Sequence, residues 1–356
     1  MSKKKLGQFY TTNSDYILEG LQLPFGGEEA VRIVEPFAGK GDLVCWAKKA
    51  AAAAAAAAVV ESYDIDPKRD DIQKRDTLLD PPNYAGAWII TNPPYLARNK
   101  TGEKGVFDRY NTNDLYKCFI MSVVEQDCKG GIFIIPAGFF FSPREVDARC
   151  RNEFMSRYRI TKVRYFEETV FDDTTTTIVA FSFVRSADIV LTSQDVEWNI
   201  LPTNKTETFH MLASNDWIIG GEIYGLPVPE GISVRRYVVG QPLKVGEQQT
   251  FITLNALDSG TKSGRIALEY KKDYLYPAKD CSRTYATFRV SGITLSEEDQ
   301  IVICELFNDY LEKKRVETWS LFLPQFRESK EYARKRIPFE LAYRIFLNII
   351  LQRTSV

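Results

Sequence analysis

The sequence predicts an α/β protein: a mostly parallel sheet covered by helices, followed by a C-terminal region of mixed α+β character. Two observations indicate this class. Between residues 31 and 185, short apolar runs alternate with helix-like stretches, which is typical of βα units. A Gly-x-Gly turn follows the first apolar run and leads into a helix. The expected strands are Val31–Glu35, Val59–Asp64, Trp88–Thr91, Ile132–Pro136, Ile160–Phe166 and Ile178–Val184.

The chain has 356 residues, more than one domain usually contains, and its texture changes near residues 185–190. Beyond that point, short strand-like pieces are broken by Gly and Pro. We therefore expect one domain over residues 1–187 and a second over 188–356. Inside the first, a helix is predicted over 113–126 and another from Asp42, which the alanines 50–58 continue. Two helices are expected near the end, at 297–319 and 337–352.

Composition excludes several classes of protein. Hydrophobic residues make up 44% and charged residues 26%, and no apolar run is long enough to span a membrane. The start of the chain lacks the apolar core of a secretion signal, which favours a cytoplasmic protein. The only histidine is His210 and the six cysteines are scattered, so no metal site is expected.

The glycine turn after the first strand reads Glu35-Pro36-Phe37-Ala38-Gly39-Lys40-Gly41. Glycines allow a ligand to approach the backbone, and the helix that follows offers unpaired N–H groups at its start. The dinucleotide fingerprint needs a third glycine at position 44, which is Val44 here. A ligand-binding turn is therefore expected, and a nicotinamide or flavin site is disfavoured.

The next strand ends in Asp64, 64 − 41 = 23 residues after the turn, at about the distance expected for a carboxylate that binds a ribose. Ile65 would pack against an adenine face, and Asp76 would accept a hydrogen bond from its exocyclic amine. Asp66 is interpreted differently, as a helix cap before Pro67. The two regions together predict a nucleoside site.

The most specific motif is Asn92-Pro93-Pro94-Tyr95, at the end of an apolar strand. Two prolines fix the backbone and remove N–H donors, which leaves carbonyl groups free to accept hydrogen bonds. The Asn92 side chain and the Pro93 carbonyl can each accept one N–H of an exocyclic amine, and Tyr95 can stack on the base that carries it. The motif predicts a site that activates an amine.

In this order, the motifs resemble the S-adenosylmethionine-dependent amino-methyltransferases of DNA, in the gamma arrangement and of restriction-modification type. The resemblance covers roughly residues 6–185 and implies a Rossmann-like methyltransferase sheet with a C-terminal target-recognition domain. It implies N6 methylation of a flipped adenine, with S-adenosylmethionine as cofactor and double-stranded DNA as partner. A cognate restriction endonuclease is a candidate partner, and the cytoplasm of a bacterial or virus-encoded system is the implied location.

The resemblance also implies roles for particular residues. Catalysis is assigned to the residues of the Asn-Pro-Pro-Tyr motif and to a second aromatic that would stack on the base: Asn92, Pro93, Pro94, Tyr95 and Phe171. Cofactor binding is assigned to Tyr10, Thr11, Glu35, Pro36, Ala38, Gly39, Gly41, Asp64, Ile65, Asp76 and Asn92. Lys40 and Asp42, which flank the second glycine, depart from the family pattern.

A basic run near the end of the chain is the candidate contact to DNA phosphates: Arg327, Lys330, Arg334, Lys335 and Arg336. The alternative is a solvated start of a helix. Three other functions remain open for the whole chain. A cytosine-N4 methyltransferase and a protein-glutamine methyltransferase share the motif, and a catalytically idle DNA-binding specificity subunit could share the fold.

Overall fold

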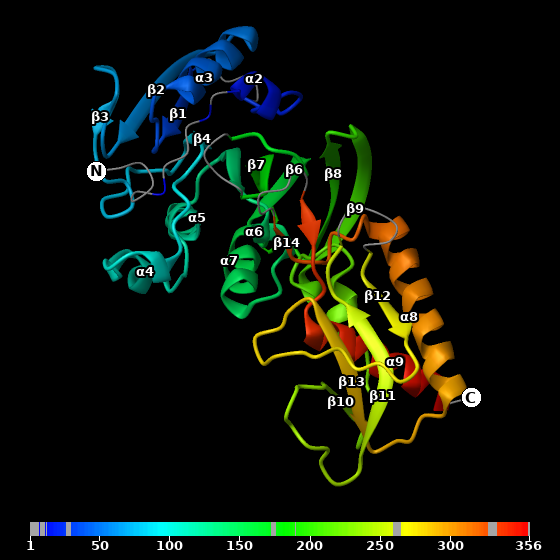
Figure 1. Cartoon of the computed structure of the whole chain (residues 1–356). Helices are drawn as coiled ribbons and strands as arrows, with labels where there is room; N and C mark the ends of the chain where they lie inside the picture. Colours follow the sequence, from blue (N-terminus) through cyan, green and yellow to red (C-terminus); the bar gives the residue numbers. More distant parts are fainter. Residues whose placement is uncertain are drawn as a thin grey trace. The chain divides into compact units, whose positions relative to one another are not determined.

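The computed structural model describes residues 7, 11, 13–25, 30–171, 176–188, 190–258, 265–326 and 333–354. The chain forms two compact units (Figure 1). Unit 1 comprises residues 1–217 and 327–333, and unit 2 comprises residues 218–326 and 334–356. The first change of unit falls after residue 217, not at the 187/188 division expected from composition.

Unit 1 is built on a nine-stranded sheet with the order β3-β2-β1-β4-β5-β7-β6-β8-β9. Its first five strands in this order are parallel, and β7 is antiparallel to both β5 and β6. The order reverses at β1, which lies between β2 and β4. The strands are β1 Ala30–Glu35, β2 Ala57–Asp64, β3 Gln73–Lys74, β4 Trp88–Thr91, β5 Gly130–Pro136, β6 Tyr158–Phe166, β7 Ile178–Arg185, β8 Ser193–Leu201 and β9 Lys205–Leu212.

All six strands expected from the apolar runs are present, because strands covered on both faces consist largely of apolar residues. All four residues of β4 are buried. At the β4–β5 pair the backbones approach so closely that a Cβ on Gly131 would lie 2.1 Å from the Ile89 carbonyl oxygen. Glycine is therefore required at this position. The sheet order and strand directions are those of a Rossmann-like methyltransferase sheet.

Helices and short turns connect these strands. The helix predicted over 113–126 is α5, which is mostly buried and packs against α4 and α7. The helical segments of unit 1 are α2 Ser14–Ile17, α3 Asp42–Ala53, η1 Arg98–Lys100, α4 Gly105–Tyr110, α5 Leu115–Gln126, α6 Gly138–Phe141, α7 Glu145–Met155 and η2 Ala213–Asn215.

The sequence predicts that alanines 50–58 continue the helix, but the structure shows that only the first of them do. Helix α3 ends at Ala53, Ala55 has a positive φ of 53°, and β2 begins at Ala57. Ala57 pairs with Ala30 at the start of β1, so strand pairing determines the conformation of the last alanines. Tertiary pairing here overrides the high helix propensity of alanine.

The later boundary of unit 1 follows from β8 and β9. β8 pairs in parallel with β6, and β9 pairs antiparallel with β8, so the sheet of unit 1 continues to residue 212. Trp198 of β8 is fully buried and packs on Phe140, with ring centroids 5.1 Å apart. Strands β8 and β9 therefore belong to unit 1, with Trp198 in its core.

Unit 2 has a four-stranded antiparallel sheet, with the order β10-β13-β11-β12, that packs against helices α8 and α9. The apolar face of the sheet and the two helices enclose one core. Both helices predicted at the end of the chain are present. The elements are η3 Gly221–Gly225, β10 Ser233–Arg236, β11 Glu247–Asn255, β12 Ala267–Tyr270, β13 Tyr285–Ser291, α8 Glu297–Thr318, β14 Gln325–Phe326, β15 Arg334–Lys335 and α9 Phe339–Thr354. None of the helices within the described ranges is long and apolar enough to cross a membrane.

Candidate active site

The glycine turn and the end of β2 are joined by hydrogen bonds. The Gly39 amide donates to Oδ2 of Asp64 over 2.8 Å, and the Ala38 amide donates to the Tyr63 carbonyl over 2.8 Å. Gly41 caps the start of α3 with φ of 86°, a conformation that favours glycine. These contacts place the turn and the Asp64 carboxylate at the carboxyl ends of β1 and β2. Ligands of open α/β sheets bind at this edge, where the strand order reverses.

Glu35, the last residue of β1, is completely buried. Its Oε1 accepts hydrogen bonds from the Thr91 hydroxyl (2.6 Å) and the Phe37 amide (3.0 Å). Its Oε2 is buried and has no hydrogen-bond partner among the described residues. Burial is the largest cause that raises the pKa of this carboxyl from 4.5 to about 8, and the nearby Asp64 adds to the increase. Glu35 is therefore mainly neutral at pH 7, and its Oε2 makes no hydrogen bond to a described residue.

The segment after β3 lies beside the glycine turn and forms another side of the candidate site. Oδ1 of Asp76 accepts hydrogen bonds from the amides of Leu78 (3.2 Å) and Leu79 (3.3 Å). The Thr77 hydroxyl donates to the Pro36 carbonyl over 2.8 Å, so this segment is attached to the glycine turn. Asp76 thus lies beside the turn, and its contact with an adenine amine stays a prediction.

The Asn-Pro-Pro-Tyr motif ends β4 and is almost fully buried. The Asn92 side chain donates from Nδ2 to the Thr11 hydroxyl over 3.1 Å, and its Oδ1 is within hydrogen-bond reach of the Tyr95 hydroxyl. That hydroxyl also donates to the Ile134 carbonyl over 2.8 Å. The Tyr95 ring meets the Tyr116 ring edge-on, with centroids 6.3 Å apart. The Asn92 amide is therefore oriented by contacts at both of its ends.

These segments meet around a cavity of about 370 Å³. Asp64, Ile65, Asp76, Asn92 and Pro94, all site residues expected from the sequence, line it. The other lining residues come from the glycine turn, the segment after β3 and the connection between β4 and α5: Phe37, Arg75, Thr77, Leu78, Leu79, Leu96, Thr101, Glu103, Gly105, Val106, Phe107 and Leu115.

A smaller cavity of about 20 Å³ adjoins the same residues. Asn92 and Phe37 line both cavities. Thr11, Ala38 and Gly39, three more of the expected cofactor residues, also line the small one, together with Lys40, Asp42 and Leu43. Pro36 and Gly41 are buried beside it in the turn. The described members of the sequence-derived cofactor set thus lie at one edge of the sheet.

The expected aromatic sandwich is not formed by exposed rings. Tyr95 is 8% exposed and Phe171 is 2% exposed, and neither lines the large cavity. Phe171 precedes residues 172–175, which lie outside the described residues. Tyr10, expected at the cofactor, also lies outside them. Stacking by Tyr95 and Phe171 stays a prediction.

Of the basic run, Arg327 and Lys330 lie outside the described residues. Arg334 and Lys335 form β15, which pairs with β14, so the segment is a strand and not the start of a helix. Lys335 donates to the Trp319 carbonyl over 2.7 Å, and Arg336 forms a bridge with Leu257. All three described residues are half-buried. Their role in DNA binding stays a prediction.

Sequence reasoning missed part of the site. Thr91, which binds Glu35, has a short polar side chain that nothing in the sequence separates from an ordinary strand residue. Phe107 and Leu115 line the cavity from α4 and the start of α5. Because they are apolar residues in helices, their sequence pattern is that of a core. Of these cavity residues, Phe37 could have been identified from the sequence, because it lies inside the glycine turn.

Comparison with known proteins gives one family. Residues 87–171 match the model of the Eco57I restriction-modification methylase family. The matched segment contains β4, the Asn-Pro-Pro-Tyr motif, the connection that lines the cavity and strand β5. A search of curated proteins finds no match.

Solved structures resemble the chain at low sequence identity. A modification subunit of a putative type I restriction enzyme from Vibrio vulnificus YJ016 shares 15% identity over 56% of this chain and 48% of its own length, with a TM-score of 0.44. A putative class I S-adenosylmethionine-dependent methyltransferase from Listeria monocytogenes shares 13% identity over 52% of this chain and 61% of its own length, with a TM-score of 0.40. The DrdV–DNA complex shares 17% identity over 71% of this chain and 35% of its own length, with a TM-score of 0.43. The chain spans about half or less of the first and third proteins.

The family match covers the motif that the sequence singled out and the elements that support it. The sheet around it has the strand order of a Rossmann-like methyltransferase. Over residues 87–171, this chain matches the restriction-modification methylase family.

Proposed function

We propose that unit 1 transfers a methyl group from S-adenosylmethionine to N6 of an adenine that has been flipped out of duplex DNA. The observation that carries the proposal is the cavity of about 370 Å³. Three separate sequence segments, which contain Asp64-Ile65, Asp76 and Asn92–Pro94, converge on it. Each was expected to bind either the cofactor or the target amine.

The residues present fit this cofactor. Asp64 and Asp76 offer carboxylates beside a largely apolar cavity, which suits the hydroxyls and the amine of an adenosine. Glu35 has a buried oxygen, close to the turn, that has no partner within the described parts of the chain, which suits the ammonium of an amino acid. When bound, the cofactor supplies an electrophilic methyl group on a sulfonium. Thr11 and Gly39 would hold its amino-acid end, because they line the adjoining small cavity with Asn92.

Asn92 and Pro93 would act on the target amine. As acceptors for its two N–H groups, Asn92 Oδ1 and the Pro93 carbonyl would draw the nitrogen lone pair out of conjugation with the ring. Asn92 is only 8% exposed, so water competes poorly for these hydrogen bonds. Positioning and paired acceptors would therefore contribute most of the rate enhancement.

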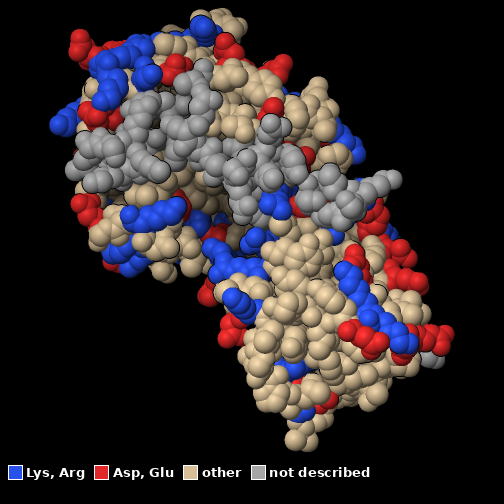
Figure 2. All heavy atoms as spheres, viewed as in Figure 1, with Lys and Arg blue, Asp and Glu red and all other residues tan. Residues whose placement is uncertain are grey.

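Unit 2 is proposed to recognise the DNA target, since none of its described residues lines either cavity. In place of the 188–356 expected at first, the proposed recognition region comprises residues 218–326 and 334–356. In the face shown in Figure 2, charges of both signs follow α8, and the region over β11 and β12 is largely uncharged. Such a surface suits contacts to base edges better than contacts to phosphates alone.

Incubation of the purified protein with tritiated cofactor and duplex DNA tests the proposal, followed by mass spectrometry of the released nucleosides. The expected product is N6-methyladenine, with no transfer by Asn92→Ala. N4-methylcytosine would replace the adenine assignment. Methyl transfer to protein only, or no transfer with intact cofactor binding, would overturn the proposed reaction.

A further inference from the structure

The segment that follows the Asn-Pro-Pro-Tyr motif is paired with the start of α5. The Arg98 amide donates to the Asn113 carbonyl over 2.9 Å, and the Leu115 amide donates to the Leu96 carbonyl over 3.2 Å. Ala97 and Asp114 form an antiparallel bridge between these contacts. The backbone just after Tyr95 therefore has a defined partner.

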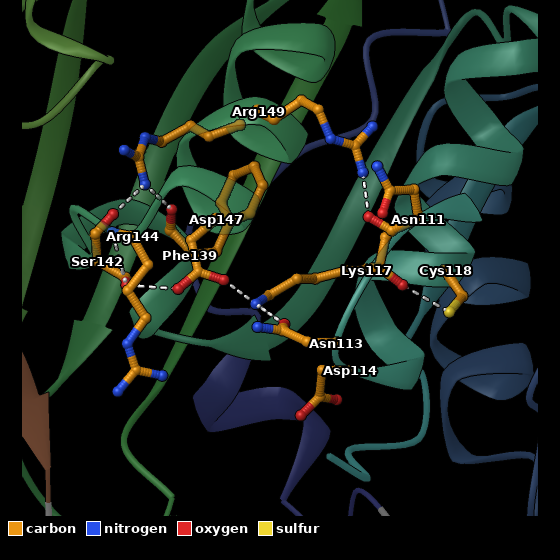
Figure 3. Close-up of polar contacts among 12 residues, drawn as sticks. Asn111, Asn113, Asp114, Lys117, Cys118, Phe139, Ser142, Arg144, Asp147 and Arg149 are labelled. Atoms are coloured by element: carbon orange, nitrogen blue, oxygen red, sulfur yellow. Dashed lines mark hydrogen bonds and ion pairs between the residues drawn. The ribbon is translucent and has the colours of Figure 1, made fainter. Parts of the chain in front are cut away.

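One side chain adds to this backbone pairing. Oδ1 of Asp114 accepts a hydrogen bond from the Leu96 amide over 3.1 Å, so the carboxylate joins both sides of the bridge. Asp114 is the residue before α5, and Figure 3 shows it next to Asn113. Burial raises the pKa of its carboxyl to about 6, and Lys117 opposes the rise. At pH 7 to 8 the group is mainly ionised and accepts strongly.

The location of this contact ties it to the candidate site. Leu96 and Leu115, on the two sides of Asp114, both line the cavity of about 370 Å³, and so does Pro94. Between Pro94 and Leu96 lies Tyr95, whose hydroxyl contacts Asn92 and whose ring packs on Tyr116. A shift of Leu96 would therefore move both the cavity wall and the group that orients the Asn92 amide.

We propose that Asp114 is a positioning residue for methyl transfer: through the Leu96 amide, its carboxylate holds the backbone after the Asn-Pro-Pro-Tyr motif and thereby fixes the Asn92 amide and the cavity wall. Asp114 touches neither reacting group. Its effect on the rate comes from geometry, because reacting atoms displaced by about 1 Å can cost about a hundredfold in rate. This inference rests on the proposed function for its kinetic consequence only.

The test compares Asp114→Ala with Asp114→Asn. Asparagine retains an acceptor at Oδ1 for the Leu96 amide, and alanine does not. With saturating cofactor and DNA in single-turnover experiments, we expect Asp114→Ala to lose about a hundredfold in transfer rate and Asp114→Asn to recover most of it. Asp127→Ala is the matched control: this aspartate follows the other end of α5, where it pairs with Arg185 over 2.8 Å. Its rate should be unchanged.

A second readout does not depend on methyl transfer. Amide hydrogen exchange of Leu96 should be slow in the wild type and in Asp114→Asn, and faster in Asp114→Ala, with exchange in β5 unchanged. Equal rates and equal Leu96 exchange in wild type and Asp114→Ala would overturn the inference, and so would equal losses in both Asp114 variants. If wild-type protein transfers no methyl group to DNA while Leu96 exchange responds as expected, the proposed function fails and the positioning contact stands.

Discussion

The Gly39 amide donates a 2.8 Å hydrogen bond to Oδ2 of Asp64, which joins the turn after β1 to the end of β2. Oδ1 of the same carboxylate accepts the Asp66 amide over 2.8 Å. Asp64 is 3% exposed and lines the large cavity, so one side chain both shapes the turn and faces the candidate ligand.

Asp64→Ala should therefore weaken cofactor binding by about 1.5–3 kcal/mol, the usual contribution of hydrogen bonds to a charged group, or roughly 10- to 150-fold in Kd. Isothermal titration calorimetry measures it. Asp66→Ala is the control, because Asp66 is exposed and its carboxylate pairs with the neighbouring Lys68 over 2.5 Å. Equal affinity of Asp64→Ala and wild type would contradict the assigned role.

Glu35 should make stability depend on pH in a recognisable direction. Its pKa is raised from 4.5 to about 8 in the folded protein, so the stability that it contributes is complete below 4.5 and is lost as pH rises toward 8. Glu35→Gln should lack this decline and become more stable relative to wild type with increasing pH. Urea unfolding between pH 3 and 9 measures the difference.

Glu61 provides a control of opposite sign. Its pKa is lowered, chiefly by a hydrogen bond from Arg32, so its stabilisation is present above pH 4.5 and is lost as pH falls. Glu61→Gln should therefore differ from wild type at neutral pH and converge with it in acid. Parallel pH profiles of the two variants would show that Glu35 is not a neutral buried group.

The ion pair between Lys117 and Asp147 should govern stability. Both side chains are 6% exposed, and they are joined by a hydrogen bond that Figure 3 shows. Lys117→Met alone leaves a buried charge without its partner and should cost about 3–5 kcal/mol, whereas Lys117→Met with Asp147→Leu should recover most of the loss. Chemical denaturation of both singles and the double variant gives the coupling energy. Additive losses would mean that the two charges do not stabilise each other.

Aromatic stacking on a flipped base can be tested with 2-aminopurine at the target position. Phe171→Leu should reduce the fluorescence change of the probe, because base–aromatic stacking contributes about 1–3 kcal/mol. Tyr95→Phe retains the ring and should preserve the signal. Since Phe171 is 2% exposed, a thermal melt must accompany each titration. An unchanged signal in a folded Phe171→Leu protein would place the stacking partner elsewhere.

The three described residues of the basic segment can be tested by separate substitutions. Lys335 is engaged with the Trp319 carbonyl, so Lys335→Met should mainly lower stability. Arg334→Gln with Arg336→Gln should weaken binding to all duplexes and reduce the slope of log affinity against log salt by up to about 0.9 for each phosphate that the variant no longer binds. Titrations of the variant and of wild type at several salt concentrations measure this slope. A slope equal to that of wild type would assign the arginines to the fold of unit 2.

Much of unit 1 could be predicted because buried parallel strands are continuous apolar runs and their ends carry the polar residues of the site. The sheet to which β8 and β9 belong was harder to predict. In β8, Val196, Trp198 and Ile200 alternate with more polar residues, which signals a strand but not the sheet that it joins. The sheet that a strand joins depends on contacts with residues distant in the sequence. The predicted domain division therefore lies about 30 residues before the change of unit in the structure.

The site shows the same limit. Asp64 and Asn92 stand out because a polar residue at the end of a buried strand needs a reason. Asp114 follows a loop and precedes a helix, where aspartate is common as a cap. Its contact with Leu96 joins residues 18 positions apart and has no sequence signature.

The Oε2 atom of Glu35, to which no described residue donates, has an acid–base consequence for ligand capture. A carboxyl that is neutral at pH 7 must ionise to pair with an ammonium group, so uptake of such a ligand there would release a proton into solution. The observed affinity would then increase with pH until the free protein itself has lost that proton, near pH 8. The heat of binding would also vary with the ionisation enthalpy of the buffer, so the buried acid would couple cofactor capture to the proton concentration of its surroundings.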